Sequence, residues 1–186
     1  MQENTESGEI KSSLEIYEIN ENTLRKLQKD NASDTEKVFN LIRSIEATVQ
    51  KGANTSPYLH SIGEKAEIIS LLYQQRQIDT QDALEKARIV IDEINQAKKE
   101  QAQKNLPAEL FSIYWILRDQ GIKNPEEKAT SMKPIFENYP YWRTSEEYER
   151  KLKQEMLKIF TKAKIGVKKS VELTNKILNV LKSGTE

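Results

Sequence analysis

The sequence predicts an all-α protein, an irregular helical bundle of about six or seven helices that follows a flexible or extended N-terminal leader. Charged residues make up 31% of the 186 residues and hydrophobic residues 37%, a mixture that suits helix surfaces around a core. Six glycines and five prolines are too few for the turns of an all-β fold. From residue 33 onward, apolar residues recur at spacings of three and four, which is the period of an amphipathic helix.

The N-terminal part of the chain is predicted to stay outside the bundle. Residues 1–13 are polar and acidic and cannot bury enough surface to offset the entropy of ordering them. "LEIYEIN", 14–20, alternates apolar and polar residues and could form an edge strand or an extended connector, and the following residues form at best a short helix. The predicted division is therefore a flexible acidic leader and connector, 1–32, followed by a helical domain, 33–186.

The first long helix begins at a cap supplied by Ser33 or Asp34 and ends in "KGANTSP", 51–57, where glycine and proline stop it. Its apolar stripe consists of Val38, Leu41, Ile42, Ile45 and Val49. The next helix begins at Pro57, a residue that suits a first turn. Gly63 in its second turn costs about 1 kcal/mol relative to alanine, which indicates a close helix crossing.

The second and third long helices are predicted to form an antiparallel hairpin, because only the short turn "QRQID" separates them. Asp79 or Thr80 caps the third helix, which runs past residue 100. The stripe of the second helix is Leu59, Ile62, Ala66, Ile69 and Leu72 or Tyr73, and that of the third is Leu84, Ala87, Val90 or Ile91 and Ile94.

The rest of the chain contains the signals of three or four more helices. "AELFSIYWILRDQ" after Pro107 is apolar nearly all round and should be the most buried helix, with Gly121 at its end. Asn124 should cap the next helix, which Pro134 and Pro140 limit. Two more helices should follow, one with Thr144 and Glu147 as its capping box and a last one at roughly 167–182.

Composition excludes several classes of function. Twenty-nine basic and 29 acidic residues give a net charge of zero, so any attraction to nucleic acid must be local. There is no cysteine, which excludes disulfides, thiolate metal sites and cysteine nucleophiles. No apolar run approaches the ~18 residues that cross a bilayer and no signal-like segment opens the chain, so we expect a soluble, cytoplasmic protein that does not bind membranes.

Motifs for catalysis are scarce. The sequence has no phosphate-binding glycine loop and a single histidine, which cannot supply an HExxH zinc site. His60 and Glu64 stand one helical turn apart, so Glu64 could orient the imidazole for acid–base work. The alternative is that His60 is a surface residue near a helix N-terminus, and we favour this second interpretation because such polar neighbours are common on solvated helices.

Two groups of residues are candidates for binding. Between Arg150 and Lys182, ten basic residues stand against two acidic ones, a local charge of +8. Lysine-rich helices can neutralise DNA phosphates, and the candidates are Lys158, Lys162, Lys168 and Lys169; the alternative is a solvated helix surface. The second group is Tyr141, Trp142 and Arg143, residue types that concentrate at protein interfaces but that can also plug the end of a helical core.

Six blocks in order resemble the C-terminal helical region of the restriction (motor) subunit, the R protein, of type I restriction-modification enzymes. The resemblance covers roughly residues 14–165 and is strongest in the "IGEKA" helix, in the "RQIDTQDAL" turn and in the Trp-Arg pair. The blocks are "YEIN", "KVFNLIRSI", "PYLHSIGEKAEII", "RQIDTQDALEK", "YWILRDQGIKNPEE" and "YPYWRTSEEYERKLKQEM". None of them is a catalytic motif.

The resemblance implies a cytoplasmic, ATP-driven DNA translocase and endonuclease that works with methyltransferase and specificity subunits on double-stranded DNA. The ATP and Mg²⁺ of that enzyme belong to its motor and nuclease domains, so no cofactor, metal or catalytic residue is expected in this chain, which would be an assembly domain from a longer subunit. The alternative is a stand-alone helical enzyme or nucleotide-binding domain with a cleft near His60 and Glu64.

Overall fold

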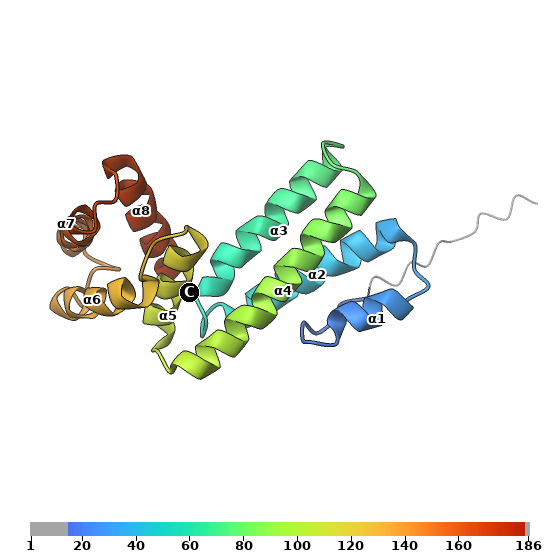
Figure 1. The fold of residues 1–186 in the computed structure, drawn as a ribbon, viewed down its shortest axis with the longest axis horizontal. Coiled ribbons are helices and arrows are strands. Elements are labelled where there is room, and N and C mark those ends of the chain that lie inside the picture. The colour runs from blue at the N-terminus through green and yellow to red at the C-terminus, as the bar shows by residue number, and fades with distance from the viewer. Residues whose placement is uncertain (1–14, 185–186) are drawn as a thin grey trace, which may run out of the picture.

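The computed structural model describes residues 15–184, which form eight α-helices and no β-strand (Figure 1). The helices are α1 (Thr23–Lys29), α2 (Asp34–Gly52), α3 (Tyr58–Gln74), α4 (Thr80–Lys104), α5 (Ala108–Asp119), α6 (Pro125–Asn138), α7 (Glu146–Lys162) and α8 (Val167–Ser183). The predicted all-α fold is confirmed. The count exceeds the expected six or seven because α1, expected at best as a short helix, is formed.

The connector before α1 lies against the helical domain. Residues 15–19 have no regular structure, so the extended connector is correct and the edge strand is not. The Tyr17 N–H donates to Ser44 Oγ at 2.8 Å, and Lys98 Nζ donates to the Ile19 carbonyl at 3.1 Å. Ile19 is only 2% exposed. The described part of the predicted leader is therefore attached to α2 and α4, and residues 1–14 lie outside the described residues.

Helices α2, α3 and α4 pack against one another, with α3 and α4 as the predicted antiparallel hairpin (Figure 1). Ser33 caps α2 in a full capping box with Glu36. A Cβ added to Gly63 would lie 3.1 Å from a methyl carbon of Val49, so the predicted close crossing is confirmed and joins α3 to α2. Even a methyl group at this position would require Val49 to shift by a few tenths of an ångström.

Helix α5 is the centre of the molecule, as its composition predicted. Eight consecutive residues, 110–117, are buried, and α3, α4, α6 and α8 all contact this helix. The Tyr58 N–H at the start of α3 donates to Ser112 Oγ at 2.9 Å, and the Tyr58 ring meets Phe111 edge to face with centroids 5.1 Å apart. The helical hairpin is thereby fixed to the C-terminal helices.

Two predicted helix boundaries near α6 and α7 are wrong. Pro134 lies inside α6 and does not end it. Its missing N–H costs the helix one hydrogen bond, but the helix continues to Asn138. Ser145, not Thr144, caps α7, and its hydroxyl accepts a hydrogen bond from the Tyr148 N–H at 3.4 Å. No helix within residues 15–184 is long and apolar enough to span a membrane.

Candidate functional site

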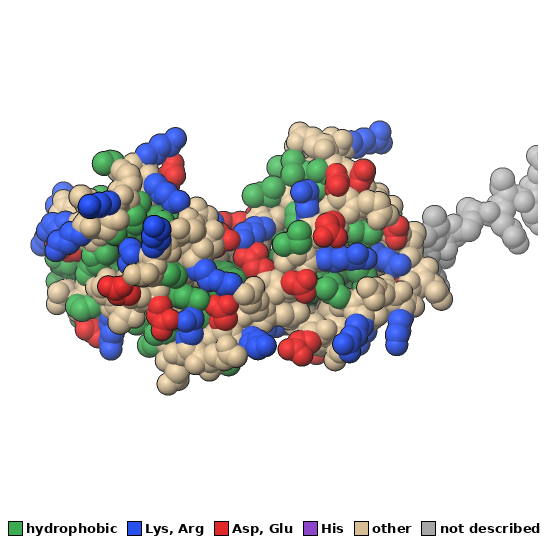
Figure 2. All heavy atoms as spheres, in the orientation of Figure 1, with side chains coloured by type: hydrophobic (Ala, Val, Ile, Leu, Met, Phe, Trp, Pro, Cys, Tyr) green, Lys and Arg blue, Asp and Glu red, His purple; other side chains and the backbone are tan. Residues whose placement is uncertain are grey.

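The reversal between α7 and α8 is an exposed basic feature of the described chain. We call residues 161–169 the lysine corner; it contains Lys162, Lys164, Lys168 and Lys169, all exposed. Lys164 has φ 57°, the left-handed conformation that turns the chain from α7 into α8. Figure 2 shows lysine and arginine side chains gathered over α7 and the beginning of α8. The sequence therefore places its unbalanced charge at a protruding turn.

The lysine corner differs from the rest of the basic C-terminal segment in its ion pairs. No carboxylate among residues 15–184 pairs with Lys162, Lys164 or Lys168, and Lys169 Nζ donates to the Gln120 carbonyl at 2.9 Å, which leaves its charge uncompensated. The other three lysines of α7 are paired with acids of the same helix: Lys151 with Glu147 at 2.6 Å, Lys153 with Glu149 at 2.9 Å and Lys158 with Glu155 at 2.6 Å. The positive field is therefore concentrated at the corner.

The α7 ion pairs also affect proton binding. The hydrogen bond and charge of Glu155 raise the pKa of Lys158, and Lys153 together with Lys182 holds the pKa of Glu149 below its usual value. Of the four lysines expected to contact DNA, Lys162, Lys168 and Lys169 thus lie together at the corner, whereas Lys158 is bound to a carboxylate. Lys164 was missed as a candidate, and only the turn geometry identifies it.

The N-terminus of α8 adds to the positive potential of the lysine corner. Gly166 precedes the helix and offers no side-chain cap, and the first turn contains no acidic residue. The free N–H groups at a helix N-terminus carry a partial positive charge. Val167, 80% exposed, is the apolar residue at the tip. The corner is therefore suited to approach an anionic surface.

Of the predicted interface residues Tyr141, Trp142 and Arg143, the last two line a cavity of about 300 Å³ between α5 and α6. They differ in accessibility: Trp142 is 2% exposed, whereas Tyr141 is 65% exposed. The Trp142 ring meets Phe136 edge to face, and Arg143 Cζ lies 4.4 Å from its centroid on the other side. Trp142 closes the end of the core, while Tyr141 and Arg143 remain at the surface.

His60 and Glu64 do not form the acid–base pair considered from the sequence. The Glu64 carboxylate lies 3.2 Å from Lys176 Nζ on α8. It therefore pairs with that lysine and does not orient the imidazole of His60. The prediction that His60 is a surface residue is also wrong, because the ring is half-buried and its Nε2 is buried with no hydrogen-bond partner. Helix α8 packs on α3 and so covers part of the surface of α3 outside its predicted apolar stripe.

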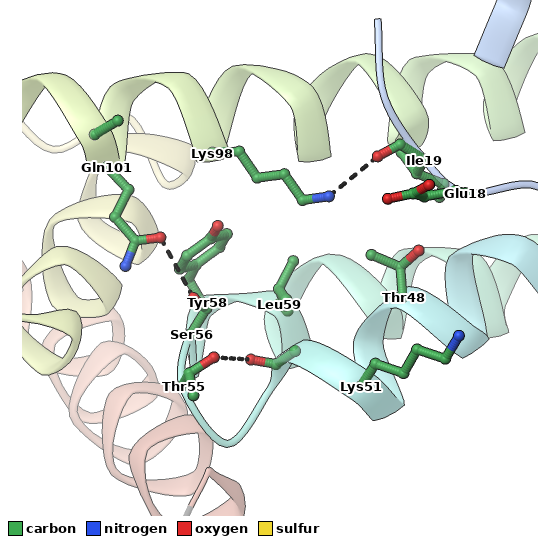
Figure 3. Close-up of a pocket in the computed structure, with 12 residues that line it drawn as sticks. Glu18, Ile19, Thr48, Lys51, Thr55, Ser56, Tyr58, Leu59, Lys98 and Gln101 are labelled. Atoms are coloured by element: carbon green, nitrogen blue, oxygen red, sulfur yellow. Dashed lines mark hydrogen bonds between the residues drawn. The ribbon is translucent and has the colours of Figure 1, made fainter. Parts of the chain in front are cut away.

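A second cavity, of about 570 Å³, lies between the connector, α2 and α4 (Figure 3). Several of its polar groups are bonded within the protein: Lys98 reaches the Ile19 carbonyl, and Ser56 Oγ donates to Gln101 Oε1 at 3.3 Å. Burial raises the pKa of Tyr58, which lies on its wall. Glu18 and Lys51 also line the cavity, and no hydrogen bond or ion pair among the described residues involves the Glu18 carboxylate or Lys51 Nζ.

Neither a search for metal-binding groups nor comparison with known proteins gives a further guide to function. Within residues 15–184, no group of three or more histidine, aspartate or glutamate side chains could hold a metal ion. Compared with protein-family models, curated proteins and solved structures, the chain gave no match. Function must therefore be inferred from the residues and their geometry.

Proposed function

We propose that this chain is the C-terminal helical region of a type I restriction enzyme motor subunit and acts in the cytoplasm. Its role is to dock the ATP-dependent translocase and endonuclease on the methyltransferase and specificity subunits and to hold double-stranded DNA beside the motor. The chain itself performs no catalysis in this proposal, because ATP and Mg²⁺ act in the motor and nuclease domains.

The order of the six sequence blocks supports the assembly role. The blocks include the α3 stretch "PYLHSIGEKAEII", the turn from α3 into α4, and the end of the central helix α5. The first of these segments contains Tyr58, whose N–H donates to Ser112 Oγ and so joins the hairpin to the central helix. The blocks thus describe a helical scaffold, which is what an assembly domain requires.

The lysine corner is the observation that carries the DNA-binding role. Its four lysines keep their charge uncompensated, while their neighbours on α7 are neutralised by glutamates. An exposed group of free lysines contacts phosphates without reading bases, and releasing counterions from DNA makes such binding fall steeply with salt. A motor that moves along any sequence needs contacts of this kind.

Fluorescence anisotropy with a random duplex of about 30 base pairs tests this role. In one variant Lys162, Lys164 and Lys168 are changed to Gln, and in the matched control the paired residues Lys151, Lys153 and Lys158 are changed to Gln. Both variants lose three positive charges. We expect the corner variant to bind weakly and to lower the slope of log K against log salt by about 0.9 for each lysine that contacts a phosphate.

The control variant should keep most of the DNA affinity, because its lysines already bind glutamates. Equal losses in the two variants would show that overall charge, not the lysine corner, determines binding. If the unmodified protein does not bind the duplex even at low salt, the DNA part of the proposal is wrong and only the docking role is left.

A further inference from the structure

The loop between α5 and α6 lies directly against the lysine corner. Lys169 Nζ donates at 2.9 Å to the carbonyl of Gln120, the residue that ends α5, so the first turn of α8 contacts this loop (Figure 1). Lys123 is three residues further along the chain, and its Cα therefore lies within about 11 Å of the Gln120 Cα. This distance is comparable to the Debye length of about 10 Å at 0.1 M salt, so the electric fields of the loop and the corner overlap.

The α5–α6 loop and the lysine corner have the same backbone geometry, the Schellman ending of a helix. At the end of α5, Gly121 has φ 67° and the Ile122 N–H donates back across the last turn of the helix. At the end of α7, Lys164 has φ 57° and the Ile165 N–H donates in the same way. Ile122 and Ile165 both pack on the core. The two turns are therefore fixed, and a ligand can bind their lysines without first ordering a loop.

Two lysines of the α5–α6 loop and the start of α6 keep their charge uncompensated. Lys123 is exposed, and no carboxylate among residues 15–184 pairs with it. Lys128 is half-buried, and its Nζ donates to the Lys123 carbonyl, which keeps the two residues side by side but does not neutralise the ammonium group. We call Lys123 and Lys128 the loop lysines.

The acidic residues beside the loop lysines only partly offset them. Asp119 and Glu126 each form an ion pair with a lysine of the helical hairpin, so their charges are already balanced. Among the described residues of segments 119–128 and 161–172, the carboxylates without a cationic partner are Glu127 and Glu172. The six lysines of the loop and the corner stand against these two carboxylates, which leaves a continuous surface with a net charge of +4.

We infer that double-stranded DNA bound at the lysine corner continues across the α5–α6 loop, where the ammonium groups of Lys123 and Lys128 contact its phosphates. Lysines spread over two fixed turns suit an extended polyanion, because the charges of a duplex repeat along its whole length. Contacts to phosphates position a protein on DNA without reading its sequence. The inference rests on the DNA-binding part of the proposed function and gives the bound duplex a direction, from the α7–α8 turn to the start of α6.

Matched pairs of substitutions test the loop lysines by fluorescence anisotropy with a random duplex of about 30 base pairs. The loop variant contains Lys123→Gln and Lys128→Gln. The control variant contains Lys86→Gln and Lys99→Gln, at exposed lysines of α4 that no carboxylate among the described residues pairs with. Both variants lose two positive charges. We expect the loop variant to lower the slope of log K against log salt by about 0.9 for each lysine, and the control variant to keep the slope.

A single substitution and a crosslink make the test independent of the half-buried Lys128. Lys123→Gln alone changes an exposed side chain and should lower the slope by about 0.9. Because the chain contains no cysteine, Lys123→Cys provides a unique attachment point for a photoreactive azidophenacyl group. Illumination of the DNA complex should join this label to the duplex, whereas the same label on Lys99→Cys should not crosslink.

Two results overturn the inference and leave the DNA-binding role of the lysine corner intact. These are a loop variant that binds with the same affinity and salt slope as the control variant, and a label at residue 123 that crosslinks to DNA no better than a label at residue 99. If the unmodified protein does not bind the duplex at low salt, the DNA-binding role itself is wrong and so is the inference. The unmodified protein therefore distinguishes the two failures.

Discussion

Lys65 connects three helices through its charge. Its Nζ lies 2.7 Å from Glu93 Oε1 on α4 and 2.6 Å from Asp119 Oδ1 at the end of α5. Burial by itself lowers the pKa of Lys65 and raises that of Asp119, but the hydrogen bonds and opposite charges outweigh it. The pKa of Lys65 therefore rises above 10.5, and that of Asp119 falls below 3.8.

We predict that Asp119→Asn lowers the stability of the protein at neutral pH and has little effect in acid. A carboxyl group whose pKa is depressed by folding contributes stability above its unfolded pKa, and that contribution is lost as the pH falls through the folded value. Because the side chains of Lys65 and Asp119 are 35% and 27% exposed, we expect a loss of only about 0.5–1 kcal/mol. Urea unfolding over a series of pH values measures it.

The control for Asp119 is Asp92→Asn, which removes an exposed carboxylate of α4 that has no ion pair among the described residues. This variant should be as stable as the unmodified protein at neutral pH. A stability difference between Asp119→Asn and the unmodified protein that stays constant down to the lowest pH would contradict the electrostatic explanation.

At the residue scale, the environment of a side chain can be predicted from the sequence when one or two neighbouring helices determine it. The stripe of α3 and the close approach at Gly63 are of this kind. His60 is not of this kind, because its half-buried ring lies outside the apolar stripe of α3 and the sequence gives no signal of what covers it. Lys158 and Lys162 look alike in the sequence, and only the side-chain positions show that Glu155 neutralises one of them. Long-range packing and rotamers leave no periodic signal.

Element boundaries depend on local chemistry that can be changed one residue at a time. Ser33 accepts a hydrogen bond from the Glu36 N–H, and the Glu36 carboxylate accepts one from the Ser33 N–H at 2.8 Å. Both bonds satisfy N–H groups that the first turn of α2 would leave free. These bonds also lower the pKa of Glu36, with the Ser33 side chain as the larger cause.

We predict that Ser33→Ala lowers the free energy of unfolding by about 1 kcal/mol, the usual value of an N-cap side chain. Ser131→Ala is the matched control, since Ser131 is exposed in the middle of α6 and only bonds back to the Lys128 carbonyl. It should leave stability unchanged or raise it slightly. Thermal unfolding followed by circular dichroism compares the two variants. Equal losses in both would contradict the assigned role of the cap.

The element scale also explains the errors in helix boundaries. Thr144 and Ser145 are both good cap residues, and only Thr144 is followed three positions later by a glutamate, Glu147, so the sequence favours Thr144; in the structure Ser145 has the extended backbone of a cap and accepts the Tyr148 N–H. Pro134 follows two turns of α6 that are already formed and packed on α5, so the loss of one hydrogen bond does not end the helix. Tertiary packing outweighs these local preferences.

At the scale of the whole molecule, the hairpin of α3 and α4 extends from one side and α6, α7 and α8 form the other, with α5 at the junction (Figure 1). The lysine corner and the cavity beside Trp142 both belong to the α5–α8 side, and their chemistry differs: the corner is strongly basic, whereas the side chains that line the cavity are largely apolar and their charges balance. Two features of different chemistry therefore lie on one side of the molecule, and the DNA contact proposed above belongs to the basic one.

The central claim is that the chain docks on the core of a type I enzyme. Sedimentation velocity of the labelled chain with its purified cognate methyltransferase and specificity subunits, in the absence of DNA, tests this claim most directly. An unrelated helical protein of similar size is the control. The account predicts a saturable complex that survives at salt concentrations that abolish duplex binding by the lysine corner. A chain that sediments alone at every concentration of the subunits would contradict it.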